Sequence, residues 1–189
     1  MRTYMPPDAI LVPSDATCVF QGKIYGVYQW QQRMFDGSYE TFEMLKRPDT
    51  VKVIAVKDND VVVLEQEQPG AKVFFDLPGG RHDVDNESEL NAAQRELKEE
   101  TGLAFNNWKL VEVSQPFTKI EWFVYLYVAT DYISTGEQSL DAGEKIKVDY
   151  MSLAQLQELL QDPRSRYLPE KVLAPLKSLD ELDRFPALS

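Results

Sequence analysis

Hydrophobic and polar residues alternate along several short stretches of the chain, and turn-forming residues separate these stretches. Such alternation predicts β-strands with one buried face, and residues 23–34 and 39–46 show it with aromatic and β-favouring side chains. Asp36-Gly37 lies between the two stretches, and this dipeptide favours a tight hairpin. Four more strands are predicted at residues 51–56, 61–66, 108–114 and 122–129. The last is almost entirely apolar, as is typical of a central strand.

One helix is predicted with defined ends, over residues 91–101. Its apolar stripe consists of Leu90, Ala93 and Leu97. Asn86 followed three residues later by Glu89 fits a capping box at the start of the helix. Gly102 stands where a residue in the left-handed conformation would end it. This segment therefore carries its own start and stop signals.

The remaining pattern predicts a mixed sheet with helices on its faces, an α+β core. Residues 73–77 form a short predicted strand that ends in the turn Pro78-Gly79-Gly80. Two C-terminal helices are predicted over residues 152–160 and 170–182. Pro175 is expected to kink or break the second of them.

The composition indicates one globular core and excludes several classes of protein. The chain has 189 residues with 43% hydrophobic content, enough for one core and a small accessory piece. Its formal net charge of −11 argues against binding nucleic acid or an anionic membrane. We find neither an apolar run of about 18 residues nor a signal peptide, so we expect the cytoplasm.

Two residue types occur once each. Cys18 is the single cysteine, so it has no internal disulfide partner, and we expect it to be a buried small hydrophobe. His82 is the single histidine, which removes Ser-His-Asp triads and histidine-rich zinc sites from consideration. His82 is expected at the surface rather than in a pocket.

Three carboxylates crowd one arc of the predicted helix. Glu96, Glu99 and Glu100 lie within five residues, with Arg95 and Lys98 as local cations. Like charges at i and i+4 repel by roughly 0.2–0.5 kcal/mol on an exposed helix. Two interpretations remain open at this point: a solvated acidic face, or a cluster of oxygen ligands of the kind that Mg²⁺ or Mn²⁺ requires.

The spacing around this cluster resembles the Nudix box. The usual form is G-x5-E-x7-R-E-U-x-E-E-x-G-U, where U is aliphatic. Here six residues separate Gly80 from Glu87, seven more precede Arg95, and the segment Arg95-Glu96-Leu97-Lys98-Glu99-Glu100-Thr101-Gly102-Leu103 follows. The single departure is one extra residue in the polar loop before Glu87, where an insertion costs little. The resemblance implies a Nudix α/β/α sandwich and hydrolysis of a diphosphate.

The resemblance also implies roles for individual residues. Glu96 and Glu100 match the main metal ligands, Glu99 matches an additional one, and the Gly79 carbonyl matches a backbone ligand. Arg95 and Glu87 match a pair that holds the loop against the helix, as a guanidinium and a carboxylate can do bidentately. Gly80 and Gly102 match structural positions of the box. The implied cofactor is Mg²⁺, with Mn²⁺ as the alternative.

The resemblance further implies a general base on a late loop. In the branch that cleaves ADP-ribose, this residue is often a glutamate. Residues 131–147 are the matching stretch, with Glu137, Asp141 and Glu144 as candidates. Glu144 is the first choice because it directly precedes an alternating, strand-like segment, and Glu137 is the second.

The chain before the box bears on the substrate. We expect residues 1–47 to form an N-terminal antiparallel β subdomain and residues 48–189 to form the Nudix domain with C-terminal helices. Such a subdomain is typical of the hydrolases of ADP-ribose and nucleoside-diphosphate sugars. It buries little surface alone, so pairing into a homodimer is expected. Candidate substrate contacts are Arg47, Gln68, Tyr28 and Trp30. Tyr28 and Trp30, together with Trp122, could stack on a base, although a role in the core or a dimer interface is the preferred interpretation of each.

Three functions follow from these observations. The first is metal-dependent hydrolysis of ADP-ribose or a nucleotide sugar to a nucleoside monophosphate and a sugar phosphate. The second is hydrolysis of a nucleoside triphosphate or dinucleoside polyphosphate by the same residues. The third is a ligand sensor with the Nudix fold and no turnover, which the presence of Glu96, Glu99 and Glu100 disfavours.

Overall fold

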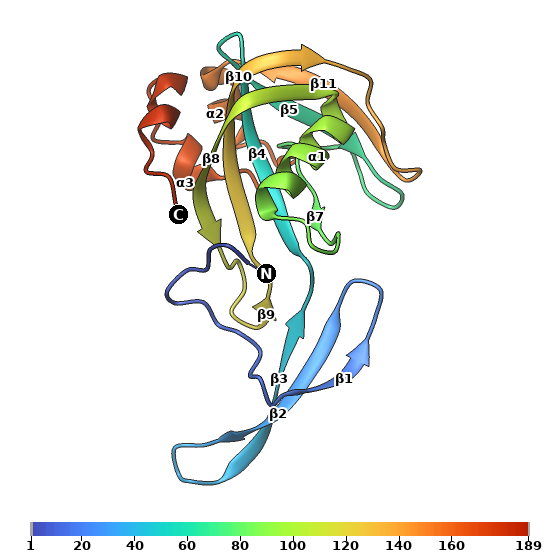
Figure 1. Ribbon diagram of the computed structural model, residues 1–189, viewed down its shortest axis with the longest axis vertical. Helices are drawn as coiled ribbons and strands as arrows, with labels where there is room; N and C mark the ends of the chain where they lie inside the picture. Colours follow the sequence, from blue (N-terminus) through green and yellow to red (C-terminus); the bar gives the residue numbers. More distant parts are fainter. Residues whose placement is uncertain (1, 189) are drawn as a thin grey trace.

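The protein consists of a long mixed sheet flanked by helices and a smaller sheet that projects from it (Figure 1). The computed structural model describes residues 2–188. Its elements are β1 (Thr17–Gln21), β2 (Gly26–Arg33), β3 (Tyr39–Lys46), β4 (Asp49–Lys57), β5 (Asp60–Glu67), β6 (Phe74–Asp76), β7 (Arg81–His82), α1 (Glu89–Thr101), β8 (Leu103–Ser114), β9 (Ile120–Glu121), β10 (Val124–Thr135), β11 (Lys145–Met151), α2 (Leu153–Leu159), α3 (Glu170–Leu173) and the 3₁₀ helix η1 (Leu179–Arg184).

The larger sheet has the strand order β11-β5-β4-β10-β8. β10 runs parallel to β4 and antiparallel to β8, so the sheet is mixed. β4 and β5 are bonded only next to their hairpin, where Val56 faces Val61 and Lys57 faces Asp60. Beyond that point the two strands diverge, and the short strands β6 and β7 add to β5 and β4 respectively. The divergence leaves room in the sheet for the glycine turn.

Helices cover both faces of this sheet. On one face, α1 buries Ala92, Ala93 and Leu97 against apolar residues of β4, β8 and β10. On the other face, α2, α3 and η1 bury Leu156, Leu173 and Leu182 against β4, β5 and β10. This arrangement confirms the predicted α+β sandwich with a mixed sheet. None of the helices in the described part of the chain combines the length and hydropathy needed to span a bilayer.

The smaller sheet has the order β1-β2-β3-β9 and projects below the main body in Figure 1. β2 and β3 form the predicted antiparallel hairpin. β9, which comes from the loop before β10, adds to β3 in parallel. The sheet therefore contains a strand from the later part of the chain, although the division at residue 47 stays a prediction.

Some local expectations differ from the structure. Ser88, not Asn86, caps α1, and its side chain accepts a hydrogen bond from the Asn91 backbone N–H. Asn86 instead has φ of 62° in the preceding turn, a conformation that asparagine tolerates. Cys18 is exposed rather than buried, because it lies on β1, whose residues are all exposed. The second C-terminal helix is interrupted at Pro175, as expected, and becomes α3 and η1.

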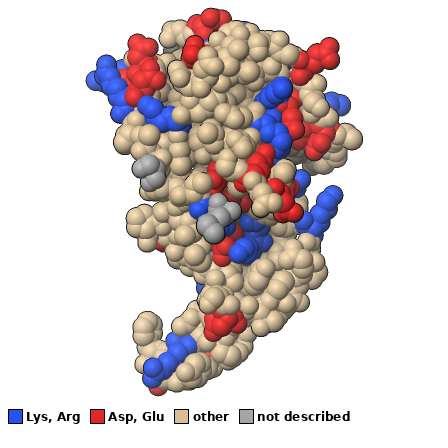
Figure 2. All heavy atoms as spheres, in the orientation of Figure 1, with Lys and Arg blue, Asp and Glu red and all other residues tan. Residues whose placement is uncertain are grey.

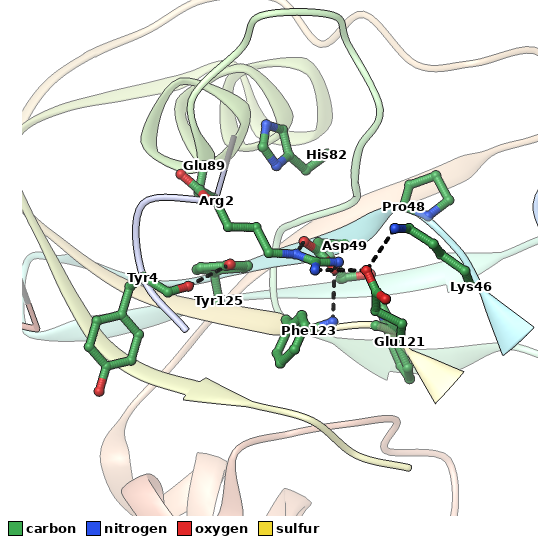
Figure 3. Close-up of polar contacts among 12 residues, drawn as sticks. Arg2, Tyr4, Lys46, Pro48, Asp49, His82, Glu89, Glu121, Phe123 and Tyr125 are labelled. Carbon is green, nitrogen blue, oxygen red and sulfur yellow. Dashed lines mark hydrogen bonds and ion pairs between the residues drawn. The ribbon is translucent and has the colours of Figure 1, made fainter. Parts of the chain in front are cut away.

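Near the start of the chain, Arg2 and Thr3 bind three buried acids: Arg2 forms ion pairs with two of them, and Thr3 donates hydrogen bonds to the third (Figure 3). Arg2 donates to both carboxylate oxygens of Asp49, at 2.6 and 3.1 Å, and to Glu121 at 2.9 Å. The backbone N–H and the hydroxyl of Thr3 each donate to Glu89 at 2.8 Å. Glu89 is fully buried in the first turn of α1. The N-terminal segment thus ties the helix of the box to the start of β4.

Arg2→Ala is expected to lower the free energy of unfolding by about 2–3 kcal/mol, because Asp49 and Glu121 are almost completely buried. The loss is limited because Asp49 still accepts from the Phe123 N–H and Glu121 still pairs with Lys46. Urea denaturation of the two proteins measures the difference. A variant as stable as the parent would mean that the Arg2 contacts contribute nothing.

Candidate active site

The glycine turn occupies the gap between β4 and β6. The Pro78 carbonyl accepts from the Val53 N–H at 2.8 Å, and the Gly80 carbonyl accepts from the Val51 N–H at 2.9 Å. Gly79 has φ of 146°, and a Cβ atom on it would lie 2.1 Å from the Val51 carbonyl oxygen. This backbone approach is open only to glycine. Within residues 2–188 we find no donor bonded to the Gly79 carbonyl, as its predicted role of metal ligand requires.

Glu100, in the last turn of α1, is buried against this turn. Its carboxylate accepts from the Gly79 N–H at 2.7 Å. Burial raises the pKa of Glu100 from 4.5 to about 8, although the Gly79 N–H and the charge of Lys52 act in the opposite direction. A carboxylate in this position costs free energy to ionise unless a cation lies close by.

Arg95 joins the other acids of the box. It donates to both oxygens of Glu87, at 3.0 and 3.1 Å, to Glu96 at 2.8 Å and to Glu99 at 3.1 Å. The fork on Glu87 holds the loop on α1, as the resemblance implies. Burial raises the pKa of Glu96 even though Arg95 partly offsets it. Gly80 allows the Glu96 carboxylate to lie close to the glycine turn, since a Cβ atom on Gly80 would lie 2.3 Å from a Glu96 carboxylate oxygen.

The loop between β10 and β11 is fixed on the end of α1. The Gly136 N–H donates to the Gly102 carbonyl at 2.7 Å, and the Ser139 N–H donates to the Glu99 carbonyl at 2.8 Å. Gly102 has φ of 72°, and a Cβ atom on it would lie 2.2 Å from the Gly136 carbonyl oxygen. Gly102 therefore both ends α1 and admits the loop.

This loop separates the candidate bases. Glu144 and Asp141 line the same cleft as Glu96 and Glu100, whereas Glu137 is exposed and does not line it. The charge of Glu144 contributes to the raised pKa of both Glu96 and Glu100, so its carboxylate lies near theirs. Glu144 is thus the candidate glutamate that the fold brings to the box.

Gly79, Gly80, Arg95, the glutamates Glu96, Glu99 and Glu100, and the loop acids Asp141 and Glu144 line one cleft of about 1000 Å³. Figure 2 shows charged side chains of both signs gathered over the middle of the molecule, whereas the face of the smaller sheet in this view is largely uncharged. Arg47 and Gln68 line the cleft, as predicted. Tyr28 and Trp30 do not line it: Trp30 packs edge-to-face on Phe42 in the smaller sheet. Their predicted role in substrate binding has no support within a single chain.

His82 lies beside the box rather than fully at the surface. It is half-buried, and its Nε2 lies 2.7 Å from the Glu87 carbonyl oxygen.

One end of the cleft carries an aromatic and cationic pair. The guanidinium carbon of Arg47 lies 4.6 Å from the centre of the Trp122 ring, a cation–π arrangement. Trp122 is oriented by its indole N–H, which donates to the Thr50 hydroxyl at 2.9 Å, and Phe117 stacks on it with ring centres 6.2 Å apart. Trp122 is only 8% exposed, so a nucleobase at this end of the cleft would contact the Arg47 guanidinium and the exposed edge of the indole rather than an open ring face.

Sequence reasoning missed several residues that line the cleft. Lys52 and Asp76 form a buried ion pair between β4 and β6, and burial raises the pKa of Asp76 despite that partner. Glu112 on β8 and Arg166 near the C-terminus also line it. Their positions follow from strand pairings between distant parts of the chain. The one local signal was Lys52, a charged residue within the apolar stretch of β4.

The donor set at α1 fits a divalent cation. Glu96, Glu99 and Glu100 supply hard carboxylate oxygens, and two of the three have a pKa raised by burial. In the structure Arg95 forms ion pairs with Glu96 and Glu99, and the Gly79 N–H donates to Glu100. Within residues 2–188, no three acidic, histidine or cysteine side chains converge on a single point. Binding a cation therefore requires these side chains to turn from their present partners.

Cation binding is expected to strengthen with pH. The pKa of Glu100 rises from 4.5 to about 8 on folding, so the folded state holds a proton that the unfolded state has lost between these values. In the metal-free protein this group lowers stability as the pH rises through that window. A divalent ion must displace the proton, so its apparent Kd should fall by up to about tenfold per unit between pH 6 and 8.

Calorimetric titration of Mg²⁺ at several pH values measures this dependence. In Glu100→Gln, which has lost both the ligand and its proton, Mg²⁺ should bind more weakly and with a smaller dependence on pH. An affinity independent of pH between 6 and 8 would contradict the burial of an ionisable Glu100 at the cation site.

Comparison with known proteins places the chain in a family. Residues 46–172 match the NUDIX domain. The chain is 25% identical over 149 residues to an ADP-ribose pyrophosphatase of Bacillus subtilis (strain 168), covering 76% of this chain and 79% of that protein. It is 30% identical over 118 residues to an ADP-ribose pyrophosphatase of Mycobacterium tuberculosis (strain ATCC 25618 / H37Rv), covering 61% and 57%.

A solved structure shares the fold. It is described as an ADP compounds hydrolase, and it matches 82% of this chain and 86% of its own with a TM-score of 0.66 and 21% identity. Together with the cleft and the box, these matches show that the chain belongs to the Nudix family and is a Nudix hydrolase. Within the family it is most similar to the ADP-ribose pyrophosphatase branch. The interpretation as a sensor without turnover is thereby disfavoured.

Proposed function

We propose that this protein hydrolyses the diphosphate of ADP-ribose, or of a closely related nucleoside diphosphate sugar, to a nucleoside monophosphate and a sugar phosphate. The observation that carries the proposal is one cleft that holds the buried box glutamates and the Arg47–Trp122 surface. A nucleoside diphosphate joined to a sugar has the matching sequence of groups: a flat base, two phosphates and a polar end. The two ADP-ribose pyrophosphatases among the relatives support the same choice.

The reaction is proposed to depend on Mg²⁺, or on Mn²⁺ in its place. Glu96, Glu99, Glu100 and the Gly79 carbonyl are the residues that would hold the ion. When bound, the ion would offset the charge of the phosphates and make a bound water more acidic. Arg95 and Glu87 would keep α1 and its loop together while Glu96 and Glu99 turn to the ion.

Glu144 is the proposed general base. It would take a proton from the water whose oxygen attacks one phosphorus atom, while the bond from that phosphorus to the bridging oxygen breaks. The bridging oxygen stays with the other phosphate, so one water and one diphosphate give two phosphate monoesters. Two observations support this role: Glu144 lines the cleft together with Glu96 and Glu100, and the loop that precedes it is hydrogen-bonded to α1 through Gly136 and Ser139.

A homodimer formed through the smaller sheet is also proposed. β1 is an edge strand, and an unpaired edge favours pairing with another chain. Large apolar side chains on this sheet and its loops are exposed to solvent, namely Val19, Phe20, Tyr25, Phe35 and Tyr39. An exposed apolar surface of this kind marks a protein interface. Light scattering of the purified protein would give the mass of two chains if the proposal holds and of one chain if it fails.

A substrate panel tests the proposed activity. Purified protein with Mg²⁺ is incubated with ADP-ribose, UDP-glucose, ATP and diadenosine tetraphosphate, and products are identified by chromatography. ADP-ribose or the nucleotide sugar should have the highest kcat/KM, with a monophosphate and a sugar phosphate as products. Preference for ATP or the dinucleoside polyphosphate would overturn the substrate assignment, and the absence of turnover with every compound would overturn the proposed function.

A further inference from the structure

Arg166 places a guanidinium in the cleft with no ion-pair partner among residues 2–188. Its guanidinium carbon lies 4.0 Å from the centre of the buried Phe74 ring. Three other cations of the cleft are paired, Arg95 with Glu87, Glu96 and Glu99, Lys52 with Asp76, and Arg81 with Asp83, whereas Arg47 and Lys171 form no ion pair among residues 2–188. A stacked guanidinium keeps its N–H donors in the plane of the group, where they remain available to a ligand.

The backbone fixes where Arg166 lies. Its N–H donates to the Phe75 carbonyl at 2.8 Å, and the Phe75 N–H donates to the Arg164 carbonyl at 2.9 Å. Residues 164–166 thereby form a short parallel bridge to β6, on the edge opposite β5. β6 continues directly into the turn that carries Gly79. Arg166 is therefore tied to the strand that positions the box, although it comes from the C-terminal part of the chain.

The two guanidinium groups of the cleft without an ion pair among residues 2–188 lie beside different strands. The buried pair of Lys52 and Asp76 joins β4 to β6. Arg47, with Trp122, lies just before β4, whereas Arg166 lies next to β6 and stacks on Phe74 of that strand. The β6 side is also lined by Gln66 and Gln68, by Asp76, which Lys52 already neutralises, and by Glu170 and Lys171 of the same C-terminal segment as Arg166. An anion that enters this side meets Arg166.

We propose that Arg166 binds the phosphate of the sugar half of the substrate, the half that does not carry the base. A guanidinium binds phosphate oxygens through two parallel hydrogen bonds. With the base at the end of the cleft that holds Arg47 and Trp122, the other phosphate and its sugar extend toward β6, where Arg166 supplies the cation. This assignment rests on the proposed function, because that function supplies the identity of the substrate. It makes Arg166 a substrate-binding residue for the phosphate that is joined to the sugar.

Arg164 provides a matched control. It lies two residues earlier on the same segment, and its carbonyl makes the equivalent backbone hydrogen bond to Phe75. Its guanidinium, however, is bonded to Asp162, at 2.7 Å for the closest pair, and Arg164 does not line the cleft. Removing either side chain removes one positive charge, but only Arg166→Ala changes the cleft.

The first experiment compares kcat and KM for ADP-ribose in the parent, Arg166→Ala, Arg166→Lys and Arg164→Ala proteins. Loss of one charge-assisted contact should raise KM by roughly 10- to 100-fold in Arg166→Ala, with kcat changed by less than about threefold. Arg166→Lys should recover part of the loss, and Arg164→Ala should match the parent. An unchanged KM in Arg166→Ala, or an equal shift in Arg164→Ala, would overturn the proposal. Thermal unfolding of each variant checks that it is folded.

The second experiment locates the contact. Inhibition by ribose 5-phosphate should weaken in Arg166→Ala while inhibition by AMP stays the same, and the reverse result would overturn the assignment to the sugar half. If the parent protein hydrolysed no diphosphate, the proposed function would fail by itself. Calorimetric binding of ribose 5-phosphate to the parent and Arg166→Ala proteins would then still decide the role of Arg166: weaker binding to the variant supports it, and equal binding or no binding to either overturns it.

Discussion

Glu100→Gln is expected to lower kcat for ADP-ribose on the order of 1,000-fold while leaving the protein folded. The substitution removes the charge of the most deeply buried of the three candidate ligands Glu96, Glu99 and Glu100 but keeps an oxygen that accepts from the Gly79 N–H. Because burial raises the pKa of Glu100 to about 8, the neutral amide should leave the metal-free protein as stable as the parent, or more stable, at pH 8. The substitution should therefore lower kcat without lowering the stability of the metal-free protein at pH 8.

Steady-state assays with Mg²⁺ and thermal unfolding without it measure the two effects. Glu158→Gln is the control, since Glu158 is an exposed acid on α2 that does not line the cleft. A Glu100→Gln protein with a nearly normal rate would remove this residue from the cation site.

Glu144→Gln is expected to lower kcat by roughly 10²- to 10⁴-fold, which is the range for loss of a general base. KM should change little, because the proposed role of Glu144 is proton transfer and not substrate binding. Glu137→Gln should have a rate within about twofold of the parent, since Glu137 is exposed and outside the cleft.

Asp141→Asn completes the comparison, because Asp141 lines the cleft beside Glu144 and its carbonyl accepts from the Glu144 N–H at 3.0 Å. If Asp141→Asn or Glu137→Gln lost activity while Glu144→Gln kept it, the base would be that residue instead. Rates are compared at saturating ADP-ribose and Mg²⁺, so that the differences reflect the chemical step.

Local sequence signals predicted the elements whose structure depends on neighbours in the chain. The Asp36-Gly37 turn, the hairpin of β4 and β5, and α1 with Gly102 at its end follow from residues within a few positions of one another. The errors are also local in origin. Asn86 and Ser88 are both good capping residues two positions apart, and the structure uses Ser88. Cys18 was expected inside because cysteine usually is, but β1 is an exposed edge strand.

The cleft was only partly predictable because distant segments build it. The box places its carboxylates and its arginine on one helix, so a resemblance in sequence was enough to find them. The pairing of Lys52 with Asp76 depends on the gap between β4 and β6, and Arg166 reaches the cleft through a bridge between Ser165 and Phe75. No periodicity or spacing reports such contacts. Candidates chosen by residue type alone, such as Trp30, lie elsewhere.

The most direct test of the account is a crystal structure of the protein with Mn²⁺ and a non-hydrolysable ADP-ribose analogue, recorded at an energy where manganese scatters anomalously. The account predicts an anomalous peak within bonding distance of Glu96 and Glu100, in contact with a phosphate oxygen of the analogue. An analogue bound in the cleft with no peak at these glutamates would contradict it.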